Sequence, residues 1–587
     1  MKKIFKFKVI CIVLTLCVAL HCFAVYAFAE DGTDFPAQYK TPLLTSVKNQ
    51  GMQGLCWAFS ATGTLEAYLL NHNMGEHDFS EEHMNWWATD DGTGAGWTGR
   101  KSGEGGWAEI PMGYLISWNG PVNESDIPYQ NGFGSRPSNL NDYSPNYGVT
   151  GIKIIPNDIS VIKKAIMEYS AVSTNYNSYS KYYNANKTAY YSPKIDDPQD
   201  GHAICVVGWD DNYQKEYFGS YSSGQYAQPK NNGAWLCKNS WGVDSGYSGY
   251  LWISYEDAYI FNEEFGTTFA VTDVQEIDTE TSLYQVEKYG ATYKYPVKED
   301  HGYTLQEATF ADVFTFDSDH DLIDKVIFYS DSVGSDYKIY YIPFDTSGEI
   351  TMNKMMWTQL SQGRVRYTGY ICDDIKDYHI NSQKGAIGIY MKAQSGKTVT
   401  IGVDEWMTQA STDKMYFNPN AQRGVSYVIG NGEKNDILDL YKRNGDDIGG
   451  MISIKLVAKK DHTPHTDSDN PGDTDSGSDS DITILTDTET FITDFDSNTD
   501  LTTDTEKETD TTDTSTDIST DNLMLGDVNF DGYVNMLDAV TIQKYIAKLI
   551  TFDNKQLFVS DVDRTKQTDL SDVVLIQKYV AKLIDKF

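Results

Sequence analysis

Residues 48–60 read KNQGMQGLCWAFS, and this stretch carries the strongest chemical signal in the sequence. Cys56 is followed by residues that suit a helix, with apolar side chains at helical spacing, which predicts a helix over 56–71 that begins at the cysteine. At that position the helix macrodipole favours the thiolate over the thiol. A lone cysteine is more often a packing residue, so a catalytic role depends on partners elsewhere in the chain.

Two later segments each place one polar side chain at the edge of an apolar predicted strand. Residues 200–209 read DGHAICVVGW and contain His202, and residues 235–242 read WLCKNSWG and contain Asn239. Either residue alone is more often a hydrogen-bonded strand end than a catalyst. With Cys56 they give the Cys, His, Asn order of a thiol protease.

The chain from about 35 to 260 resembles the papain family of cysteine peptidases. The shared motifs are the segment from Gln50 through CWAFS, FSEE at 79–82, GG at 105–106, PY at 128–129, HA at 202–203 and NSWG at 239–242. The resemblance implies a papain-like α+β fold in which Cys56 is the nucleophile and His202 the general base and then acid. Asn239 would orient the imidazole.

The resemblance also implies the groups that bind the substrate. The side-chain amide of Gln50 and the backbone N–H of Cys56 would surround the developing oxyanion, and Trp241 would shield the His–Asn hydrogen bond. The remaining substrate-binding residues implied by the motifs are Gly105, Gly106 and Ala203. Glycine has no side chain, so an extended substrate backbone could approach the glycine pair closely.

Three features depart from the family pattern. A disulfide common in the family is replaced by Gln53 and, on our alignment, Gly103. The segment between His202 and Asn239 is longer than usual, which predicts an inserted loop over about 211–232. Few residues separate the predicted signal cleavage site from Cys56, so an N-terminal inhibitory propeptide is not expected. None of these changes removes a catalytic group.

Other cysteines and histidines have simpler interpretations. Strand parity points Cys205 and Cys237 to opposite faces, which favours buried free thiols over a disulfide. His72, His77 and His83 fit no zinc-binding spacing, and they are predicted on a surface helix and loop rather than at a metal.

The N-terminal residues and the net charge limit the classes of protein to which this sequence can belong. Residues 1–29 carry four lysines, no acid and a short apolar run that ends in Ala-Phe-Ala, as a secretory signal peptide does; an uncleaved membrane anchor is the alternative. The 587 residues carry a net charge of −37, which disfavours nucleic-acid binding in the absence of a basic patch. Few cysteines remain after the signal, so disulfides do not form the framework.

Composition divides the rest of the chain into domains. The predicted peptidase domain covers 30–269, and a second domain covers 270–460, where short alternating runs at 325–330, 337–342, 386–392, 398–403 and 451–457 predict an antiparallel β-sandwich. The tyrosines at 337–341 could stack on sugars but are more often half-buried sheet residues. The order of these two domains resembles bacterial peptidases with a lectin-like domain.

Residues 461–522 are mainly Asp, Thr and Ser, with 19 acids against one lysine, which predicts a disordered linker that glycosylation could modify. A duplicated segment follows at 523–587, where the helix-compatible IQKYIAKLI at 542–550 returns as IQKYVAKLI at 576–584. Each copy follows an acidic loop with oxygen-bearing residues at the spacing of a calcium loop. The proposed ligands are Asp527, Asn529, Asp531, Tyr533, Asn535 and Asp538 in the first loop and Asp561, Asp563, Asp569 and Asp572 in the second.

The duplicated loop–helix units resemble a type I dockerin, which implies a cohesin partner contacted through Met536 and Leu537 or through Leu570 and Ser571. The second loop has Thr565 and Lys566 where the first has aspartate and glycine, so we expect calcium to bind the first loop more tightly. A structural calcium domain without a partner is the alternative.

The sequence as a whole predicts a secreted thiol endopeptidase that is attached to a cellulosome-like complex at the cell surface through calcium-dependent docking. Calcium is the expected cofactor of the loops, and catalysis is expected to need none. The alternative is an adhesion protein that binds protein or carbohydrate material of the cell wall and has lost turnover. The four intact residues Gln50, Cys56, His202 and Asn239 favour the enzyme.

Overall fold

The computed structural model describes residues 35–460 and 524–586. The residues left out within these ranges are 91, 93–95, 98, 132–133, 195–200, 220–227, 288, 297–304, 318, 405–406, 410–413, 417–420, 441, 444–445, 448–449, 530–533, 535, 547–550, 566 and 581–585. The predicted signal peptide and acidic linker lie outside the described residues. The chain forms two compact units that divide at residue 470, and each is described by itself.

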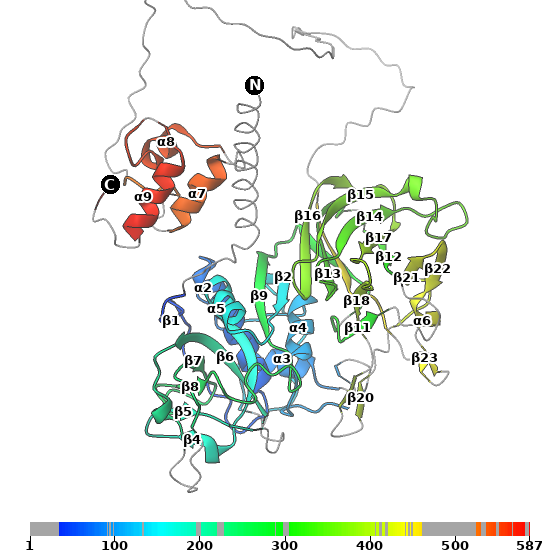
Figure 1. The fold of residues 1–587 in the computed structure, drawn as a ribbon. Coiled ribbons are helices and arrows are strands. Elements are labelled where there is room, and N and C mark those ends of the chain that lie inside the picture. Colours follow the sequence, from blue (N-terminus) through cyan, green and yellow to red (C-terminus); the bar gives the residue numbers. More distant parts are fainter. Residues whose placement is uncertain are drawn as a thin grey trace, which may run out of the picture. The chain divides into compact units, whose positions relative to one another are not determined.

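The first part of the larger unit mixes helices and strands (Figure 1). Its helices are α2 (Cys56–Asn71), α3 (Glu81–Trp87), α4 (Glu109–Ile116) and α5 (Ile159–Tyr169). Its strands are β1 (Gln38–Lys40), β2 (Tyr147–Ile154), β3 (Val172–Asn177), β4 (Tyr183–Asn184), β5 (Ala189–Tyr190), β6 (Gly201–Asp210), β7 (Ala234–Lys238), β8 (Tyr250–Ser254) and β9 (Phe269–Glu276). The helix predicted over 56–71 is confirmed at both ends.

Burial explains the two longest helices of this part. Helix α2 is buried from Trp57 to Leu69, so it forms the centre of the core rather than a surface helix. Helix α5 is amphipathic: its apolar side packs on the sheet, and the side chain of Asp158 caps it by accepting from the backbone N–H groups of Ser160 and Val161.

The second part of the same unit is almost entirely β-structure. Its strands are β10 (Thr281–Gln285), β11 (Tyr293–Pro296), β12 (Glu307–Thr315), β13 (Leu322–Ser330), β14 (Asp336–Ile342), β15 (Thr358–Arg364), β16 (Gly369–His379), β17 (Lys384–Lys392), β18 (Thr400–Val403), β19 (Met407–Gln409), β20 (Lys414–Tyr416), β21 (Ser426–Gly430), β22 (Glu433–Asp436), β23 (Lys442–Arg443), β24 (Asp446–Asp447) and β25 (Ile454–Lys459). A short helix, α6 (Ile437–Leu440), accompanies β22.

These strands form the predicted antiparallel sandwich. One sheet has the order β15-β14-β17-β12-β21-β22, and the other contains β10-β25-β13-β16. Apolar side chains of both sheets, among them Phe310 and Ile339 from the first and Phe328 and Leu456 from the second, share one core. Tyr337 and Tyr341 face this core, so these two tyrosines are sheet residues rather than a sugar platform.

The second sheet of the sandwich continues into the first part of the unit. Strand β16 pairs with β2 through Gly369 opposite Lys153 and Tyr370 opposite Ile152, and the path continues as β2-β9-β3-β6-β7-β8-β5-β4. Figure 1 shows β2 and β9 between the helices of the first part and strands β13 and β16 of the second. One sheet therefore runs through both predicted domains, and the predicted boundary near 270 lies at the start of β9.

The apolar run predicted as a strand over 451–457 pairs with two different strands, β18 and β13. Ile452 bridges Val403, and the backbone N–H of Ser453 donates to the carbonyl of Gly402. Only from Ile454 does the chain pair with β13. Strand β25 therefore begins later and ends later than the alternation predicts, because the first residues of the run pair beside β18.

The smaller unit contains the duplicated segment. Its helices are α7 (Met536–Ile546), α8 (Asn554–Ser560) and α9 (Leu570–Val580). Two of them follow the predicted loops, and their core includes Ile542 and Ile576 at equivalent positions of the repeat. Helix α8 was not predicted, although Asp553 and Gln556 form a capping box at its start.

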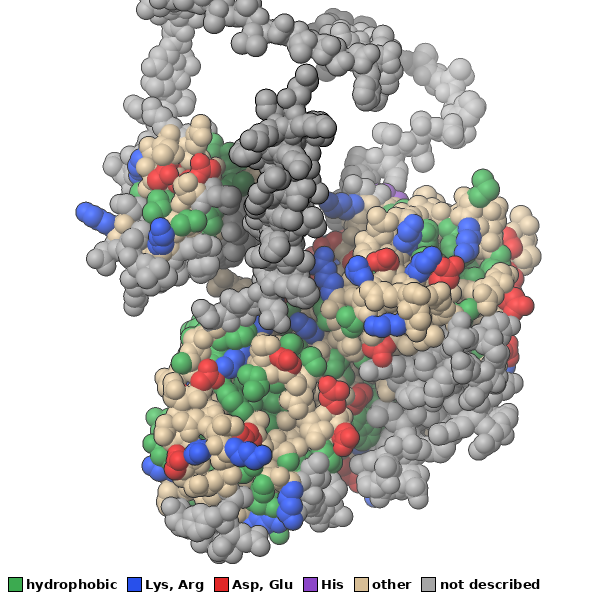
Figure 2. Space-filling model, in the orientation of Figure 1, with side chains coloured by type: hydrophobic (Ala, Val, Ile, Leu, Met, Phe, Trp, Pro, Cys, Tyr) green, Lys and Arg blue, Asp and Glu red, His purple; other side chains and the backbone are tan. Residues whose placement is uncertain are grey.

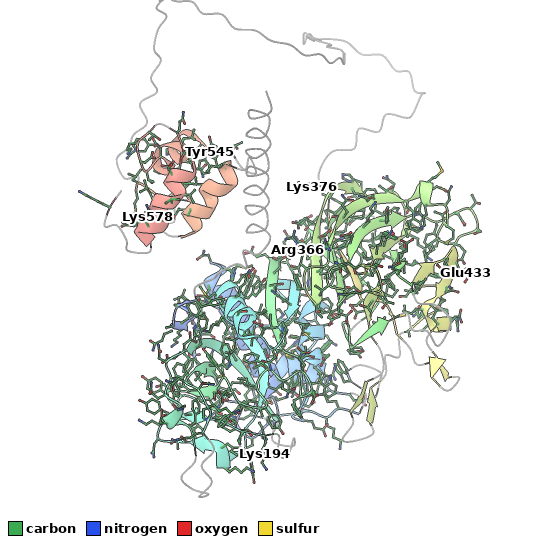
Figure 3. All side chains as sticks on the ribbon, viewed as in Figure 1. Lys194, Arg366, Lys376, Glu433, Tyr545 and Lys578 are labelled. Carbon is green, nitrogen blue, oxygen red and sulfur yellow. The ribbon has the colours of Figure 1, made fainter. Side chains whose placement is uncertain are left out.

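The described surface carries charges of both signs. Figure 2 shows Lys and Arg side chains interspersed with Asp and Glu on the face that is drawn, and Figure 3 shows the side chains that fill the space between the helices and sheets. No helix among the described residues is both long and apolar enough to cross a membrane.

Candidate active site

Strands β6 and β7 bring His202 and Asn239 together. His202 Nε2 lies 2.8 Å from Asn239 Oδ1, and this oxygen also accepts from the backbone N–H of Ser240 at 2.8 Å. Because a backbone N–H can only donate, Oδ1 is an acceptor, and the proton of the bond to His202 belongs to Nε2. The lone pair of the imidazole is therefore on Nδ1, where it can act as a base.

Cys56 is the first residue of α2, as predicted, and its side chain is half-buried. Burial raises the pKa of the Cys56 thiol, while hydrogen bonds from the backbone N–H groups of Ala203 and Trp57 oppose this shift. Burial therefore outweighs the helix position, which had predicted a thiol of lowered pKa.

Burial also lowers the pKa of His202 to about 4, against the opposing effect of the hydrogen bond with Asn239. Each group on its own thus favours its neutral form. Passing the proton from Cys56 to His202 creates two opposite charges at once, and their attraction offsets part of the desolvation cost.

Two aromatic rings enclose the imidazole of His202. The ring of Trp241 lies 4.6 Å from it, centroid to centroid, and the ring of Tyr176 lies 5.6 Å away with an edge-to-face orientation. Trp241 is 38% exposed and Tyr176 is buried, so one ring forms the solvent side of the site and the other its floor. Tyr176 stands opposite His202 in the β3–β6 pair, a contact that the motifs did not reveal.

The side chain of Gln50 is held at both of its polar atoms. Ser240 Oγ donates to Gln50 Oε1 at 2.6 Å, and Gln50 Nε2 donates to the carbonyl of Gln53 at 2.7 Å. The amide nitrogen has a second N–H, which is the group that an oxyanion would need. Ser240, next to Asn239, therefore orients a second residue of the site, and sequence reasoning had not assigned it this role.

A buried ionic network fixes the segment that precedes Gln50. Lys48 Nζ contacts carboxylate oxygens of Glu66 at 2.7 Å, Asp78 at 2.7 Å and Glu81 at 2.9 Å. Burial alone would lower the pKa of Lys48, but the nearby carboxylates raise it overall. Because Glu66 lies on α2 and Glu81 on α3, the network ties the segment before Gln50 to the helix that begins with Cys56.

The glycine pair occupies two different environments. A Cβ added to Gly105 would meet no atom within 4 Å, which leaves an open surface for a substrate backbone, whereas one added to Gly106 would lie 2.8 Å from Trp57 Nε1. The predicted replacement of the disulfide is also visible. A Cβ on Gly103 would lie 1.8 Å from Gln53 Oε1, so these two residues are direct neighbours.

Cys205, Cys237 and His83 are buried side chains outside the proposed catalytic set. Cys205 and Cys237 are buried free cysteines, as parity predicted. His83 was predicted at the surface, and that prediction is wrong: the residue is 4% exposed. Its Nε2 donates to the carbonyl of Leu140, and its Nδ1 accepts from the hydroxyl of Tyr114. These partners lie far away in sequence, so local pattern could not reveal the burial.

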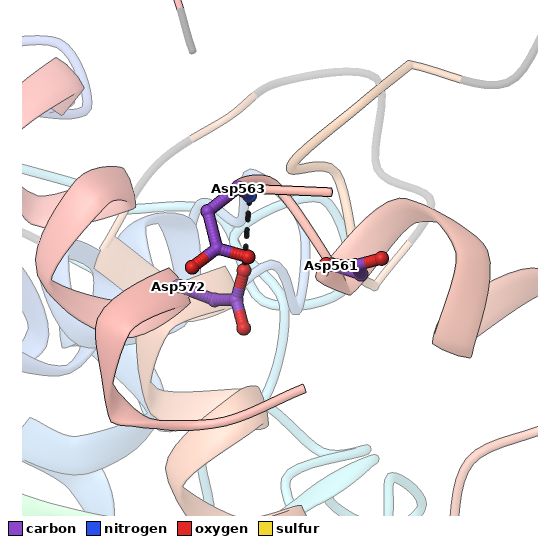
Figure 4. Close-up of side chains that lie close together, drawn as sticks. All are labelled: Asp561, Asp563 and Asp572. Atoms are coloured by element: carbon purple, nitrogen blue, oxygen red, sulfur yellow. Dashed lines mark hydrogen bonds between the residues drawn. The ribbon is translucent and has the colours of Figure 1, made fainter. Parts of the chain in front are cut away.

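The second calcium loop gathers three of its four predicted ligands. The carboxylates of Asp561, Asp563 and Asp572 offer oxygens within 4.8 Å of one another (Figure 4). Asp572 Oδ1 accepts from the backbone N–H of Asp563 at 3.2 Å, while Asp569 instead accepts from the backbone N–H of Ser571 at the start of α9. This cluster fits a hard cation that prefers oxygen ligands.

In the first loop, Asp538 is buried and accepts from the backbone N–H groups of Val528 and Asn529. Asp527 is buried beside them. The other predicted ligands, Asp531, Tyr533 and Asn535, lie outside the described residues. Of the predicted partner contacts, Ser571 is exposed on α9, and the side chains of Met536, Leu537 and Leu570 are not described.

Three family models match the chain. They are the papain family cysteine protease over residues 33–265, the lectin like domain over 283–446 and the dockerin type I domain over 525–581. The solved structure of the cysteine protease and lectin-like domains of Cwp84, a surface layer associated protein of Clostridium difficile, is 32% identical with a TM-score of 0.63. That match covers 73% of this chain and 89% of Cwp84 in that structure. The chain belongs to the papain family of cysteine proteases.

Other papain-family proteases match the first part alone. Procathepsin L of Rattus norvegicus is 28% identical over 215 residues, which cover 36% of this chain and 57% of the relative. Digestive cysteine proteinase 1 of Homarus americanus is 27% identical over 215 residues, or 35% of this chain and 58% of the relative. The chain thus spans just over half the length of these curated relatives. The resemblances to the papain family, a lectin-like domain and a type I dockerin are confirmed.

Proposed function

We propose that this papain-family chain hydrolyses peptide bonds through Cys56, His202 and Asn239, with Gln50 at the oxyanion. The observation that carries the proposal is the hydrogen bond that orients the imidazole: Asn239 Oδ1 lies 2.8 Å from His202 Nε2, so the lone pair of the ring is on Nδ1. Cys56, the first residue of α2, is the thiol that the motifs pair with this imidazole. This arrangement supports proton transfer from the thiol to His202 Nδ1.

The chemistry then follows in two halves. The Cys56 sulfur attacks the substrate carbonyl, and the Gln50 amide and the Cys56 backbone N–H stabilise the oxyanion. The C–N bond breaks as His202 returns its proton to the leaving amine, which leaves a thioester on Cys56. A water molecule, deprotonated by His202, hydrolyses the thioester and regenerates the thiol. Asn239 keeps the imidazole in the tautomer that both proton transfers need.

Labelling by an epoxysuccinyl thiol-protease probe tests this proposal. We expect the folded chain to be labelled once, at Cys56, and Cys56→Ala to abolish labelling. Cys372→Ala is the matched control, because Cys372 is also a half-buried free thiol but lies on β16. This variant should be labelled like the wild-type chain. If the folded wild-type chain is not labelled, the peptidase proposal fails and a binding role in adhesion is favoured.

The match to a dockerin supports a further part of the proposal: the chain is exported and attaches to a cohesin-bearing scaffold in a calcium-dependent way. The clustered Asp561, Asp563 and Asp572 carboxylates and the buried Asp538 support calcium binding by both loops. Binding to a type I cohesin should therefore be lost in excess chelator and restored by Ca²⁺.

Calorimetric titration of the full chain with Ca²⁺ tests the order of affinity. We expect the first loop to bind at least tenfold more tightly than the second, because the second has Thr565 and Lys566 in place of a carboxylate and a turn glycine. Asp538→Asn should remove the tighter event, and the matched variant Asp572→Asn should remove the weaker one. Equal affinities, or loss of the same event in both variants, would contradict the assignment.

A further inference from the structure

The segment that leads to the glycine pair lacks the family's covalent link to the nucleophile segment. Gln53 and Gly103, which stand where that disulfide is common, are held together by a backbone hydrogen bond instead: the N–H of Gly54 donates to the carbonyl of Gly103 at 2.9 Å. One such bond contributes less to stability than a disulfide does. Within the peptidase domain, Asn85 also holds the segment by accepting from Arg100 and from the backbone N–H of Gly103, and the lectin-like domain adds a further contact.

Tyr289, from the connection between β10 and β11 of the lectin-like domain, contacts the start of this segment. Its hydroxyl donates to the carbonyl of Gly96 at 2.8 Å. Its ring lies 5.4 Å from that of Trp97 and 5.8 Å from that of Trp87, centroid to centroid. Tyr289 is 7% exposed, so it forms part of the core shared by the two domains.

The contact continues to the glycine pair through packed rings. Trp97 packs edge to face on Trp107 at 5.5 Å, and Trp107 directly follows Gly105 and Gly106. Edge-to-face pairs of this kind are specific in geometry, so displacing one ring moves the next. Tyr289 thus lies two rings away from the open backbone at Gly105 and does not touch it.

The same tyrosine also supports the far end of the segment. Trp107 leads into α4, and a Cβ added to Gly113 of that helix would lie 2.0 Å from the carbonyl oxygen of Tyr289. Glycine at this position lets the backbone of the lectin-like domain lie directly against α4. Tyr289 therefore contacts the start of the 96–107 segment and the helix that follows the segment.

Tyr289 is itself fixed by the lectin-like domain. The backbone N–H of Ala291 donates to the hydroxyl of Tyr370 on β16, and the buried carboxylate of Glu287 pairs with Lys455 and accepts from Ser453, both near β25. Glu287 and Ala291, two residues before and two residues after Tyr289, are thus bonded to the long sheet.

We propose that Tyr289 is a positioning residue for substrate binding: the lectin-like domain adds support to the 96–107 segment, and with it to Gly105, where the family's disulfide is missing. This inference rests on the proposed peptidase function. It predicts that disturbing Tyr289 weakens the binding of an extended peptide and leaves the reactivity of Cys56 itself unchanged.

Steady-state hydrolysis of an extended peptide by the full-length chain tests the proposal. Tyr289→Phe removes only the hydroxyl, and we expect KM to rise about fivefold with kcat changed by less than twofold. Tyr341→Phe is the matched control, since it removes a hydroxyl that bonds Ser382 within the lectin-like domain. The rate of alkylation of Cys56 by iodoacetamide, a reagent too small to use the 96–107 segment, should be the same in all three proteins.

Gly113→Ala gives a second, independent variant. Alanine is the better helix former, so α4 would be stabilised if its contact with Tyr289 were unimportant. We expect KM to rise instead, at least as much as in Tyr289→Phe. Gly63→Ala in α2 is the control, because a Cβ there meets Cys205 Sγ only at 3.9 Å, which is ordinary contact.

Hydrogen exchange of the backbone amides at 99–107 separates this inference from the peptidase proposal. We expect faster exchange there in Tyr289→Phe and Gly113→Ala than in their controls, whether or not the wild-type chain turns over peptide. Unchanged KM and unchanged exchange would overturn the inference. So would a loss of kcat and alkylation rate in parallel with KM, because that pattern indicates general damage to the fold. If the wild-type chain hydrolyses no peptide, the exchange result alone decides.

Discussion

At the scale of single residues, Ser240 connects two residues of the proposed catalytic site, Asn239 and Gln50. Its backbone N–H bonds the carbonyl oxygen of the Asn239 side chain, and its hydroxyl bonds that of Gln50. One residue therefore sets the direction of both amides. The hydroxyl bond turns the Gln50 carbonyl towards Ser240, so that the amide N–H groups face the other way.

Removing either partner of the hydrogen bond between Ser240 and Gln50 should lower kcat, but by different factors. Gln50→Ala removes an oxyanion donor and should lower kcat about 100-fold, while Ser240→Ala leaves the donor in place but unoriented and should lower it about tenfold. Gln214→Ala is the control, since it removes an exposed glutamine that bonds the nearby Asn212 carbonyl. Steady-state kinetics on one peptide substrate compares the three. An equal loss in both test variants would contradict a purely orienting role for Ser240.

Buried His83 makes the stability of the fold depend on pH. Burial lowers its pKa from 6.5 to about 4, so the unfolded chain binds this proton first as the pH falls. The stabilisation is complete above pH 6.5 and is lost towards pH 4, by about 3 kcal/mol. In urea titrations, His83→Gln should reduce the loss of unfolding free energy between pH 6.5 and pH 4. The control is His72→Gln, which changes an exposed histidine and should leave this pH dependence as it is in the wild type. An unchanged slope in His83→Gln would contradict the prediction.

At the scale of elements, the junction between β16 and β2 decides how the two domains meet. Gly369 has a φ of 140°, and a Cβ there would lie 2.1 Å from the carbonyl oxygen of Ile152 on β2. The backbone of the lectin-like domain can pair with the peptidase sheet at this point only because the residue has no side chain.

Gly369→Ala should therefore lower the unfolding free energy by about 3 kcal/mol, since it adds a steric clash to the strain of a positive φ. Gly396→Ala is the matched control: its φ is also positive, but an added Cβ meets nothing within 4 Å, and about 1 kcal/mol is expected. Urea denaturation followed by tryptophan fluorescence compares the two. Equal losses would mean that the junction contributes nothing beyond local strain.

The elements that depend on residues close together in the chain were predicted from the sequence. Helix α2 and strands β6 and β7 follow from periodicity, and Gln53 beside Gly103 follows from the motif order. The pairing of Tyr370 with Ile152 does not, because alternation tells which face of a strand is buried but not which strand lies beside it. The capping box of α8 was present in the sequence at Asp553 and Gln556, but its short helix has no repeat partner.

At the scale of the whole molecule, the peptidase and lectin-like domains share one core. Buried residues of the lectin-like domain that belong to the core cluster of the peptidase are Tyr289, Ala291, Ile327, Tyr329, Tyr370 and Val457. Burial of a large apolar side chain contributes about 2 kcal/mol, so their summed contribution is comparable to the net stability of a domain. The two domains are therefore expected to unfold together.

Truncation tests this expectation. A chain that stops at residue 460 should unfold at the same temperature as the full chain and hydrolyse peptide at the same rate, because the described strands and helices of the peptidase and lectin-like domains belong to one compact unit. A chain that stops at residue 280 should be insoluble or unfold at least 15 °C lower, since it loses the shared core. Thermal unfolding followed by circular dichroism measures both. A stable, fully active short chain would contradict the shared core.

The continuous sheet from β10 to β4 also has a consequence for how such proteins can be rearranged during evolution or by a protein engineer. Gene fusions tend to succeed where a cut leaves few contacts severed. A cut near residue 270 would separate hydrogen-bonded strands, whereas a cut beyond Lys460 lies where the larger unit ends its last strand. We therefore expect the peptidase and lectin-like domains to tolerate transfer only as one piece, whereas the dockerin can be cut away without severing the sheet.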